Sequence, residues 1–133
     1  MRKYEFLGHT ADFRIRVYGR NFKEIIQNSL LALKSFWKPK LTKEKEEIFL
    51  DLENKNPAFL LIDFLSEVLS QTYIKKAIFL NFNEEELSLN KIKGKLNGFR
   101  FTLLKKDIKA ITYHQANFYE NKGLFIFEFI IDI

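Results

Sequence analysis

The sequence predicts an α+β fold: a two-layer sandwich in which a largely antiparallel sheet packs against two helices. Two stretches repeat apolar residues at helical spacing, and each opens with an asparagine. About six further stretches have the length and the apolar pattern of strands, and most of them follow residue 77. The 133 residues suit a single domain spanning residues 1–133.

The composition excludes several classes of protein. A hydrophobic fraction of 47% with fifteen phenylalanines excludes a disordered chain and predicts an aromatic core. The absence of cysteine excludes disulfides, thiol nucleophiles and cysteine-based metal sites. The longest apolar stretch, residues 58–65, is too short to cross a bilayer, and no apolar signal core follows Met1. We therefore expect a soluble cytoplasmic protein without a membrane partner.

The net charge of +5 is the bulk property that bears on partners. A basic surface attracts RNA phosphates or an acidic protein face. The lysines are scattered along the chain, however, and no RGG tract, zinc knuckle or aromatic RNA-binding signature accompanies them. This pattern favours a solvated charged surface over a dedicated RNA-binding surface.

The first half of the chain predicts a strand, a helix and a second strand. Apolar residues alternate over 13–17, and Gly19 ends this strand. Asn21 and Glu24 form a capping-box pattern that opens a helix ending before Pro39. The charged residues 42–47 are expected to form a loop before a short strand over 48–52.

A second helix is predicted to begin at Asn56 and Pro57, an N-cap residue followed by proline at the first helical position. Apolar residues occupy most of its positions, so most of its circumference should be covered. Asp63 and Glu67 stand four residues apart on one face. Such a pair can bind a metal, but a solvent-exposed side of the helix is the favoured interpretation.

Strand patterns dominate the second half of the chain. We expect strands over residues 77–82, over 86–93 with a break at Gly94, and over 99–104 after an Asn97–Gly98 turn. Residues 108–119 and 124–133 flank the hairpin signal Asn-Lys-Gly at 121–123.

The last strand ends in an acidic position whose neighbours depend on the hairpin register. If the turn centres between residues 121 and 122, Asp132 lies opposite Ile111, with Lys109 and Tyr113 diagonal to it. A slip of one residue would instead put Thr112 and His114 on the face of Asp132. The first register is preferred because it matches the phenylalanine-rich face to residues 110, 116 and 118.

Both ends of the chain carry candidate metal ligands. Asp132 and the terminal carboxylate of Ile133 are two anionic groups, and Asp12 supplies a third if the two end strands are neighbours. Such an all-oxygen set suits calcium, magnesium or manganese and suits zinc poorly. The alternative is that these acids are solvated.

Enzyme signatures are absent from the sequence. It has no phosphate-binding loop of the GxxxxGK[ST] type, no GxGxxG and no GxSxG motif. His9 and His114 are the only histidines, and their spacing supports no catalytic triad. We therefore assign no catalytic residue and no small-molecule substrate.

Four blocks of sequence, in order, resemble the archease family. They are His-Thr-Ala-Asp at 9–12 followed by Arg-Val-Tyr-Gly at 16–19, Ile-Asp-Phe-Leu-Ser-Glu-Val-Leu at 62–69, Ile-Lys-Ala-Ile-Thr-Tyr-His at 108–114, and Ile-Ile-Asp-Ile at 130–133. The blocks span nearly the whole chain. The resemblance implies an archease-like version of the predicted α+β sandwich.

The resemblance also implies a function. Archeases are protein cofactors of the RtcB-type RNA ligase, which acts in tRNA splicing and RNA repair, and they promote ligase guanylylation and multiple turnover. The family binds a divalent metal at one end of its fold, which implies Asp12, Asp132 and Ile133 as ligands here. The resemblance places Lys109 in the same functional tip, and His9 and His114 match family positions with supporting roles. tRNA would be met indirectly, through the ligase.

Two other functions remain open from the residues. One is a chaperone-like or RNA-binding module that acts directly on RNA or protein partners. The other is a small metal-dependent hydrolase built on the same acids, although the sequence offers no general base for it.

Overall fold

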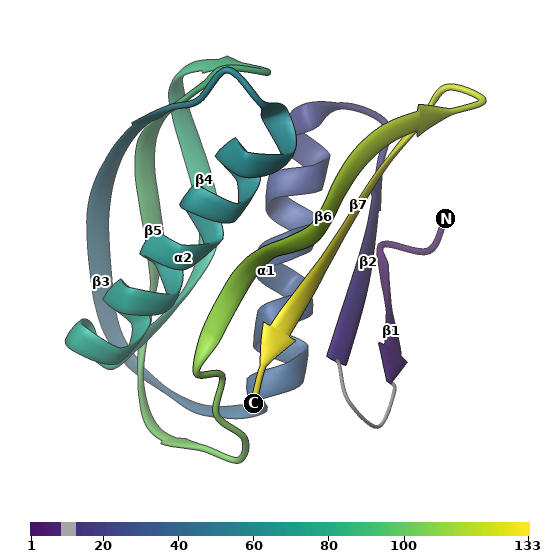
Figure 1. The fold of residues 1–133 in the computed structure, drawn as a ribbon. Coiled ribbons are helices and arrows are strands. Elements are labelled where there is room, and N and C mark those ends of the chain that lie inside the picture. The colour runs from purple at the N-terminus through teal and green to yellow at the C-terminus, as the bar shows by residue number, and fades with distance from the viewer. Residues whose placement is uncertain (9–12) are drawn as a thin grey trace.

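The computed structural model describes residues 1–8 and 13–133 (Figure 1). This part of the chain contains nine elements: β1 (Tyr4–Gly8), β2 (Phe13–Gly19), α1 (Phe22–Trp37), β3 (Pro39–Glu53), α2 (Pro57–Lys75), β4 (Ala77–Ser88), β5 (Lys91–Leu104), β6 (Ala110–Asn121) and β7 (Leu124–Asp132). Two helices accompany antiparallel strands, so the predicted α+β class is confirmed.

The strands divide between two sheets, a separation that the sequence did not reveal. The four-stranded sheet has the order β1-β2-β7-β6, and the three-stranded sheet has the order β3-β5-β4. Every strand pair described is antiparallel. In the four-stranded sheet, β2 near the start of the chain pairs with β7 at its end.

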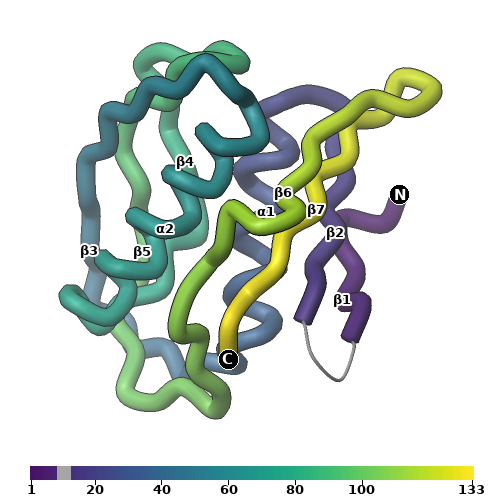
Figure 2. The backbone as a smooth tube through the Cα atoms, viewed as in Figure 1, coloured from purple at the N-terminus to yellow at the C-terminus, as the bar shows by residue number. Residues whose placement is uncertain are grey.

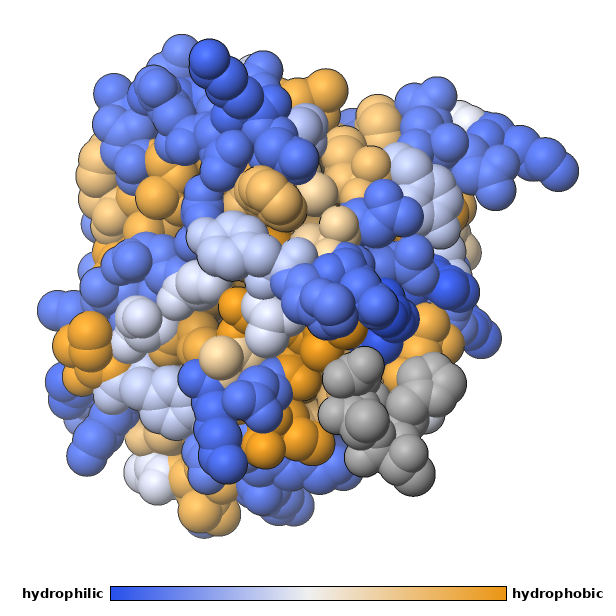
Figure 3. Space-filling model, viewed as in Figure 1, coloured by the Kyte–Doolittle hydropathy of each residue, from blue (hydrophilic) through white to orange (hydrophobic). Residues whose placement is uncertain are grey.

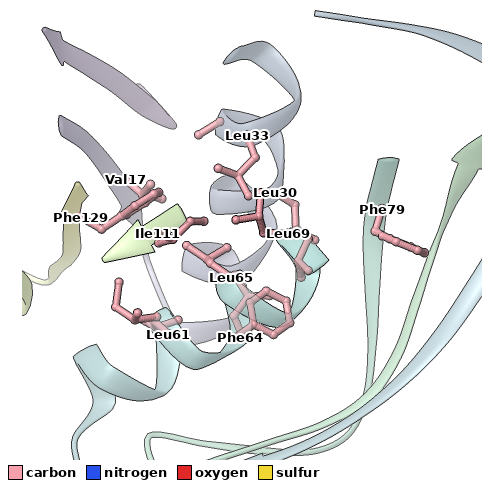
Figure 4. Close-up of a cluster of buried hydrophobic side chains, with 14 of the residues drawn as sticks. Val17, Leu30, Leu33, Leu61, Phe64, Leu65, Leu69, Phe79, Ile111 and Phe129 are labelled. Carbon is pink, nitrogen blue, oxygen red and sulfur yellow. The ribbon is translucent and has the colours of Figure 1, made fainter. Parts of the chain in front are cut away.

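Both helices contact both sheets (Figures 1 and 2). α1 packs against β2 of the four-stranded sheet and β4 of the three-stranded sheet, while α2 packs against β6 and against all three strands of the other sheet. The core therefore lies around the helices and between the inner faces of the sheets. Figure 4 shows Val17, Phe129 and Ile111 from one sheet facing Leu30 of α1 and Leu65 of α2.

The helix boundaries follow the predicted caps. The side chain of Asn21 accepts a hydrogen bond from the amide of Glu24 at 2.9 Å, and α1 ends at Trp37, before Pro39. Glu24 reaches back to the amide of Arg20, at 3.0 Å, rather than to that of Asn21. Asn56 caps α2 through the amide of Phe59 at 3.1 Å.

The predicted loop over residues 42–47 is wrong, because β3 extends from Pro39 to Glu53, although its register against β5 shifts between Lys40 and Lys45. This strand lies at an edge of the three-stranded sheet, where charged side chains are tolerated on the solvent side. Its acids pair with lysines of β5: Glu47 lies 3.7 Å from Lys95, and Asp51 lies 2.9 Å from Lys91. Cross-strand charge pairing thus replaces the apolar alternation by which strands are normally detected.

Gly94 and Gly98 lie inside β5, so the predicted break at Gly94 and the predicted turn at Asn97–Gly98 are wrong. The turn falls at residues 89–90, within the stretch expected to be one strand over 86–93. A Cβ at Gly98 would lie 1.8 Å from the carbonyl oxygen of Ile78, and one at Gly94 would lie 2.2 Å from that of Asn83. These glycines allow β4 to approach closely where its register against β5 shifts.

In the described ranges, neither helix has the combination of length and apolarity needed to cross a membrane.

Candidate functional site

The candidate metal ligand Asp132 is the last residue of β7. The preceding residue, Ile131, lies opposite Phe13, the first residue of β2. The chain therefore resumes at Phe13 beside the end of β7. Asp12 and His9, the other candidates from the opening motif, lie outside the described residues.

The expected register of the last hairpin is wrong at this end. Asp132 lies opposite Ala110 instead of Ile111, so the alternative register, displaced by one residue, applies here. Ile111 lies opposite Ile131, and both side chains are buried in the core. Thr112 consequently shares the face of Asp132.

Two features set this register. The turn consists of Lys122 and Gly123, one residue later than assumed, and both have positive φ angles, of 54° and 79°. β6 then advances five residues from Thr112 to Asn117 while β7 advances only two, which leaves three extra residues on β6. Hydrophobic alternation does not predict an irregularity of this size.

His114 lies in this irregular segment of β6, which also contains Gln115 in a left-handed conformation with φ 57°. His114 is exposed and is four residues along the strand from Ala110, the partner of Asp132. The structure thus brings together Lys109, Asp132 and Ile133, and it does not bring His114 to the same end of the strand.

Lys109 is held beside Asp132 by the backbone. Its amide donates a hydrogen bond of 2.7 Å to the carbonyl oxygen of Asp132. Lys109 belongs to the connection between β5 and β6, residues 105–109, whose start is also anchored: the amide of Lys105 donates to the carbonyl of Trp37 at 3.0 Å.

The hydroxyl of Tyr73 anchors the middle of this connection. It accepts hydrogen bonds from the indole of Trp37 at 3.2 Å and from the amide of Ile108 at 3.0 Å, and it donates to Asp107 at 3.1 Å. Burial is the main reason why the pKa of Tyr73 is raised. No sequence motif predicts this anchor, because α1, α2 and the connection are distant in sequence.

The carboxylates at this end are accessible. Asp132 is exposed, and Ile133 is 55% exposed. Within residues 1–8 and 13–133, no hydrogen bond or ion pair engages the side chain of Asp132. The same ranges contain no group of three or more histidine, cysteine, aspartate or glutamate side chains placed to hold a metal. The side chain of Asp132, which has no partner among the described residues, suits a hard cation, and the other predicted ligands are the terminal carboxylate of Ile133 and Asp12.

Asp63 and Glu67, the acidic pair on α2, have protein partners. Asp63 accepts a hydrogen bond from the side-chain amide of Asn54 at 3.0 Å and another from the hydroxyl of Tyr113. The contact with Asp63 is the main cause of the raised pKa of Tyr113. Glu67 accepts from Gln71 at 3.1 Å. Both side chains are half-buried and have protein partners, so this side of α2 is less exposed to solvent than the favoured interpretation assumed.

The face of the four-stranded sheet that carries Asp132 also holds a charged network. Arg16 lies 3.0 Å from Glu5 and 2.8 Å from Glu128, and the hydroxyl of Tyr18 donates to Glu5 at 2.6 Å. The hydrogen bond from Tyr18 is the main reason why the pKa of Glu5 is lowered. Because each of these carboxylates already has a partner, the network stabilises the sheet and does not compete with Asp132 for a cation.

The fold and this end of it define a class of protein: a small α+β protein whose candidate site includes an exposed carboxylate at the end of a strand. The sequence pattern of the Archease protein family matches residues 4–133. The chain belongs to this family.

Proteins named archease align with this chain over its full length. The chain is 34% identical to the protein archease of Sulfurisphaera tokodaii over 148 aligned positions and 33% identical to that of Sulfolobus acidocaldarius over 144, and each alignment covers 100% of both proteins.

Solved structures share the fold. The crystal structure of an archease from Thermotoga maritima, titled a possible chaperone, superposes with a TM-score of 0.76 at 20% identity and covers 100% of this chain and 98% of that one. The solution structure of protein 1598 from Methanobacterium thermoautotrophicum superposes with a TM-score of 0.71 at 20% identity over 100% of both chains.

Proposed function

We propose that this protein is a single-domain, metal-binding protein cofactor, not an enzyme, and that it activates an RtcB-type RNA ligase in tRNA splicing and RNA repair in the cytoplasm. Membership of the Archease family supports the ligase as partner, with tRNA met through the ligase. The proposed metal ligands are Asp12, Asp132 and Ile133, and the proposed cation is calcium, magnesium or manganese.

One observation carries the assignment of the metal end: Phe13 and Ile131 lie opposite each other on neighbouring strands. Asp12 and Asp132 are each one residue from this pair, and consecutive Cα atoms are about 3.8 Å apart. The proposal therefore puts two acids, more than a hundred residues apart in sequence, at one strand end. An oxygen-only ligand set there suits a hard cation.

Within this proposal, the residues of the chain have distinct tasks. The carboxylates of Asp12 and Asp132 bind the cation, and the backbone contact between Lys109 and Asp132 fixes the distance between β7 and the β5–β6 connection. The side chain of Lys109 is exposed and adds a positive charge that can contact the ligase or its nucleotide. The cation, when bound, supplies charge neutralisation, on which phosphoryl transfer depends strongly.

The test is a guanylylation time course of a cognate RtcB-type ligase with and without this protein. We expect the natural sequence to accelerate guanylylation, and Asp12→Asn and Asp132→Asn each to reduce the stimulation at least tenfold. Glu86→Gln removes an exposed carboxylate of β4 and serves as the matched control, with stimulation retained. Full stimulation by a folded Asp12→Asn/Asp132→Asn variant would refute the proposal.

A further inference from the structure

A basic groove lies at the end of the fold where α1 ends, β3 begins and β5 ends (Figure 1). It is an open hollow of about 450 Å³ lined by Lys38, Pro39, Lys40, Leu103 and Lys105. Three lysines thus come from two segments more than sixty residues apart in sequence. We call these five residues the basic groove.

The backbone holds the two sides of the basic groove together. Lys40 lies opposite Leu103 in the pairing of β3 with β5, and the amide of Lys105 donates to the carbonyl of Trp37, the residue before Lys38. The backbone positions of the three lysines are therefore set by strand pairing and by the end of α1.

Several basic residues elsewhere have acidic partners. On the three-stranded sheet, Lys91 contacts Asp51 and Glu53, and Arg100 contacts Glu44 and Glu46. By contrast, Lys38, Lys40 and Lys105 are exposed, and none of them forms an ion pair with any residue that the structure describes. Part of the net charge of +5 is thus concentrated here without internal compensation.

The positive surface extends beyond the groove. A neighbouring hollow of about 530 Å³ shares Lys38 and Pro39 with the basic groove and adds Lys3 and Lys34. The two hollows form a continuous path with five lysines along its sides. A path of this kind suits a linear polyanion better than a compact anion.

We propose that the basic groove binds the phosphodiester backbone of RNA directly. Lysine provides a flexible point charge that neutralises phosphates without reading sequence. Protein–protein interfaces, in contrast, are depleted in lysine and enriched in aromatic residues and arginine. The basic groove is lined by lysine, proline and leucine. The composition of the groove therefore favours a nucleic-acid backbone over an acidic protein face.

This proposal goes beyond ligase activation, in which tRNA is met through the ligase. It requires neither the metal end nor the ligase. The β5–β6 connection nevertheless joins the two surfaces, since it begins at Lys105 in the groove and ends at Lys109 beside Asp132. RNA bound in the groove would thus lie at the same end of the fold as the proposed metal ligands.

The test measures binding of the isolated protein to a fluorescently labelled single-stranded RNA by anisotropy, in EDTA and without ligase. Affinity should fall with added salt, with a slope of about −0.7 for each phosphate neutralised. The triple variant Lys38→Asn/Lys40→Gln/Lys105→Gln should bind at least about tenfold more weakly at low salt, and its slope should be shallower by about two. Asparagine is chosen at residue 38 because φ there is 50°, a conformation that asparagine tolerates.

The matched control is Lys45→Gln/Lys55→Gln/Lys122→Asn. It removes the same charge from exposed lysines outside the groove, and Lys122 has a similar φ of 54°. The control should keep the natural affinity and slope. Equal losses in the two triple variants, or no salt-dependent binding by the natural sequence, would overturn the proposal.

A third arm separates RNA from an acidic protein partner. A glutamate polymer of the same charge should bind much more weakly than the RNA. Binding as tight as that of the RNA, with the same loss in the groove variant, would assign the groove to an acidic protein surface and also overturn the proposal. Because EDTA is present throughout, a failure of the metal site would leave this result unchanged.

Discussion

The amide of Lys109 donates a 2.7 Å hydrogen bond to the carbonyl oxygen of Asp132. This bond holds the end of the β5–β6 connection beside the end of β7. Asp132 lies at the end of a strand within the four-stranded sheet, and Lys109 is the last residue of the β5–β6 connection, which is anchored to α1 and α2. The exposed carboxylate of Asp132 is therefore attached to a backbone that is hydrogen-bonded to neighbouring segments. Figure 3 shows hydrophobic and hydrophilic residues mixed in the lower half of this face, whereas hydrophilic residues cover the tip of the β6–β7 hairpin at the upper right.

The anchor at Tyr73 can be tested by Tyr73→Phe. The change removes a hydroxyl that accepts from Trp37 and Ile108 and donates to Asp107, and it leaves two N–H donors without that partner. We expect a loss of about 1–3 kcal/mol in the free energy of unfolding, measured with urea. Hydrogen exchange of the Lys109 amide should also become faster.

Tyr119→Phe is the matched control for Tyr73→Phe. The hydroxyl of Tyr119 has no hydrogen-bond partner among the residues that the structure describes, so its loss should change the free energy of unfolding by less than about 0.5 kcal/mol. If both variants unfold at the same urea concentration as the natural sequence, the hydroxyl of Tyr73 does not anchor the connection.

The close approach of β4 to β5 predicts a severe effect of Gly98→Ala. The added Cβ would lie 1.8 Å from a backbone oxygen, which no rotamer change can relieve. We expect a destabilisation of about 3 kcal/mol or more, visible in urea or thermal unfolding. Among the described residues, a Cβ at Gly8 would meet Phe13 alone, at 3.9 Å, so Gly8→Ala should cost less than about 0.5 kcal/mol. Similar stabilities of the two variants would show that the strands separate at little cost.

These glycines also show how far the sequence could predict the structure. Caps at Asn21 and Asn56 act through neighbouring residues, and both helix starts were correct. The role of Gly98 depends on Ile78, which lies on another strand, so a single-sequence pattern read it as a turn. The charged part of β3 over residues 42–47 was missed for the same reason, since its acids pair with Lys95 and Arg100 of β5.

The candidate site was likewise predictable in part. A cluster at the end of the last strand followed from the position of Asp132, and the backbone contact with Lys109 is consistent with it. The register was wrong, because the extra residues between Thr112 and Asn117 leave no signature in the hydrophobic alternation. The basic groove was also missed: its lysines are dispersed in sequence and come together only through the pairing of β3 with β5.

The charged network on the four-stranded sheet predicts a pH dependence. The hydrogen bond from Tyr18 holds the pKa of Glu5 below its usual range, so the folded state binds fewer protons at Glu5 than the unfolded state in acid. The stabilisation is therefore fully present above the ordinary glutamate range and is lost as the pH falls through the lower, folded value. Urea unfolding measured from pH 6 to about pH 3 should show this loss.

Glu5→Gln should remove this contribution, so that the stability of the variant falls less steeply over the same acidic interval. Glu120→Gln, at an exposed position for which no partner is described, should leave the profile unchanged. An identical acid profile for Glu5→Gln and the natural sequence would contradict the role given to Tyr18.

Metal binding itself predicts a stability effect that needs no ligase. A ligand that binds only the folded state stabilises it by about 2.7 kcal/mol at a hundredfold excess over its dissociation constant. Calcium, or magnesium or manganese in parallel, should therefore raise the thermal midpoint of the natural sequence, and EDTA should reverse the increase. Asp132→Asn should abolish most of this shift because it removes one of the two exposed carboxylates at the end of β7, whereas Glu86→Gln should keep it. The decisive result against the metal end would be a cation-dependent shift of the same size in Asp132→Asn, since the cation would then bind elsewhere on the chain.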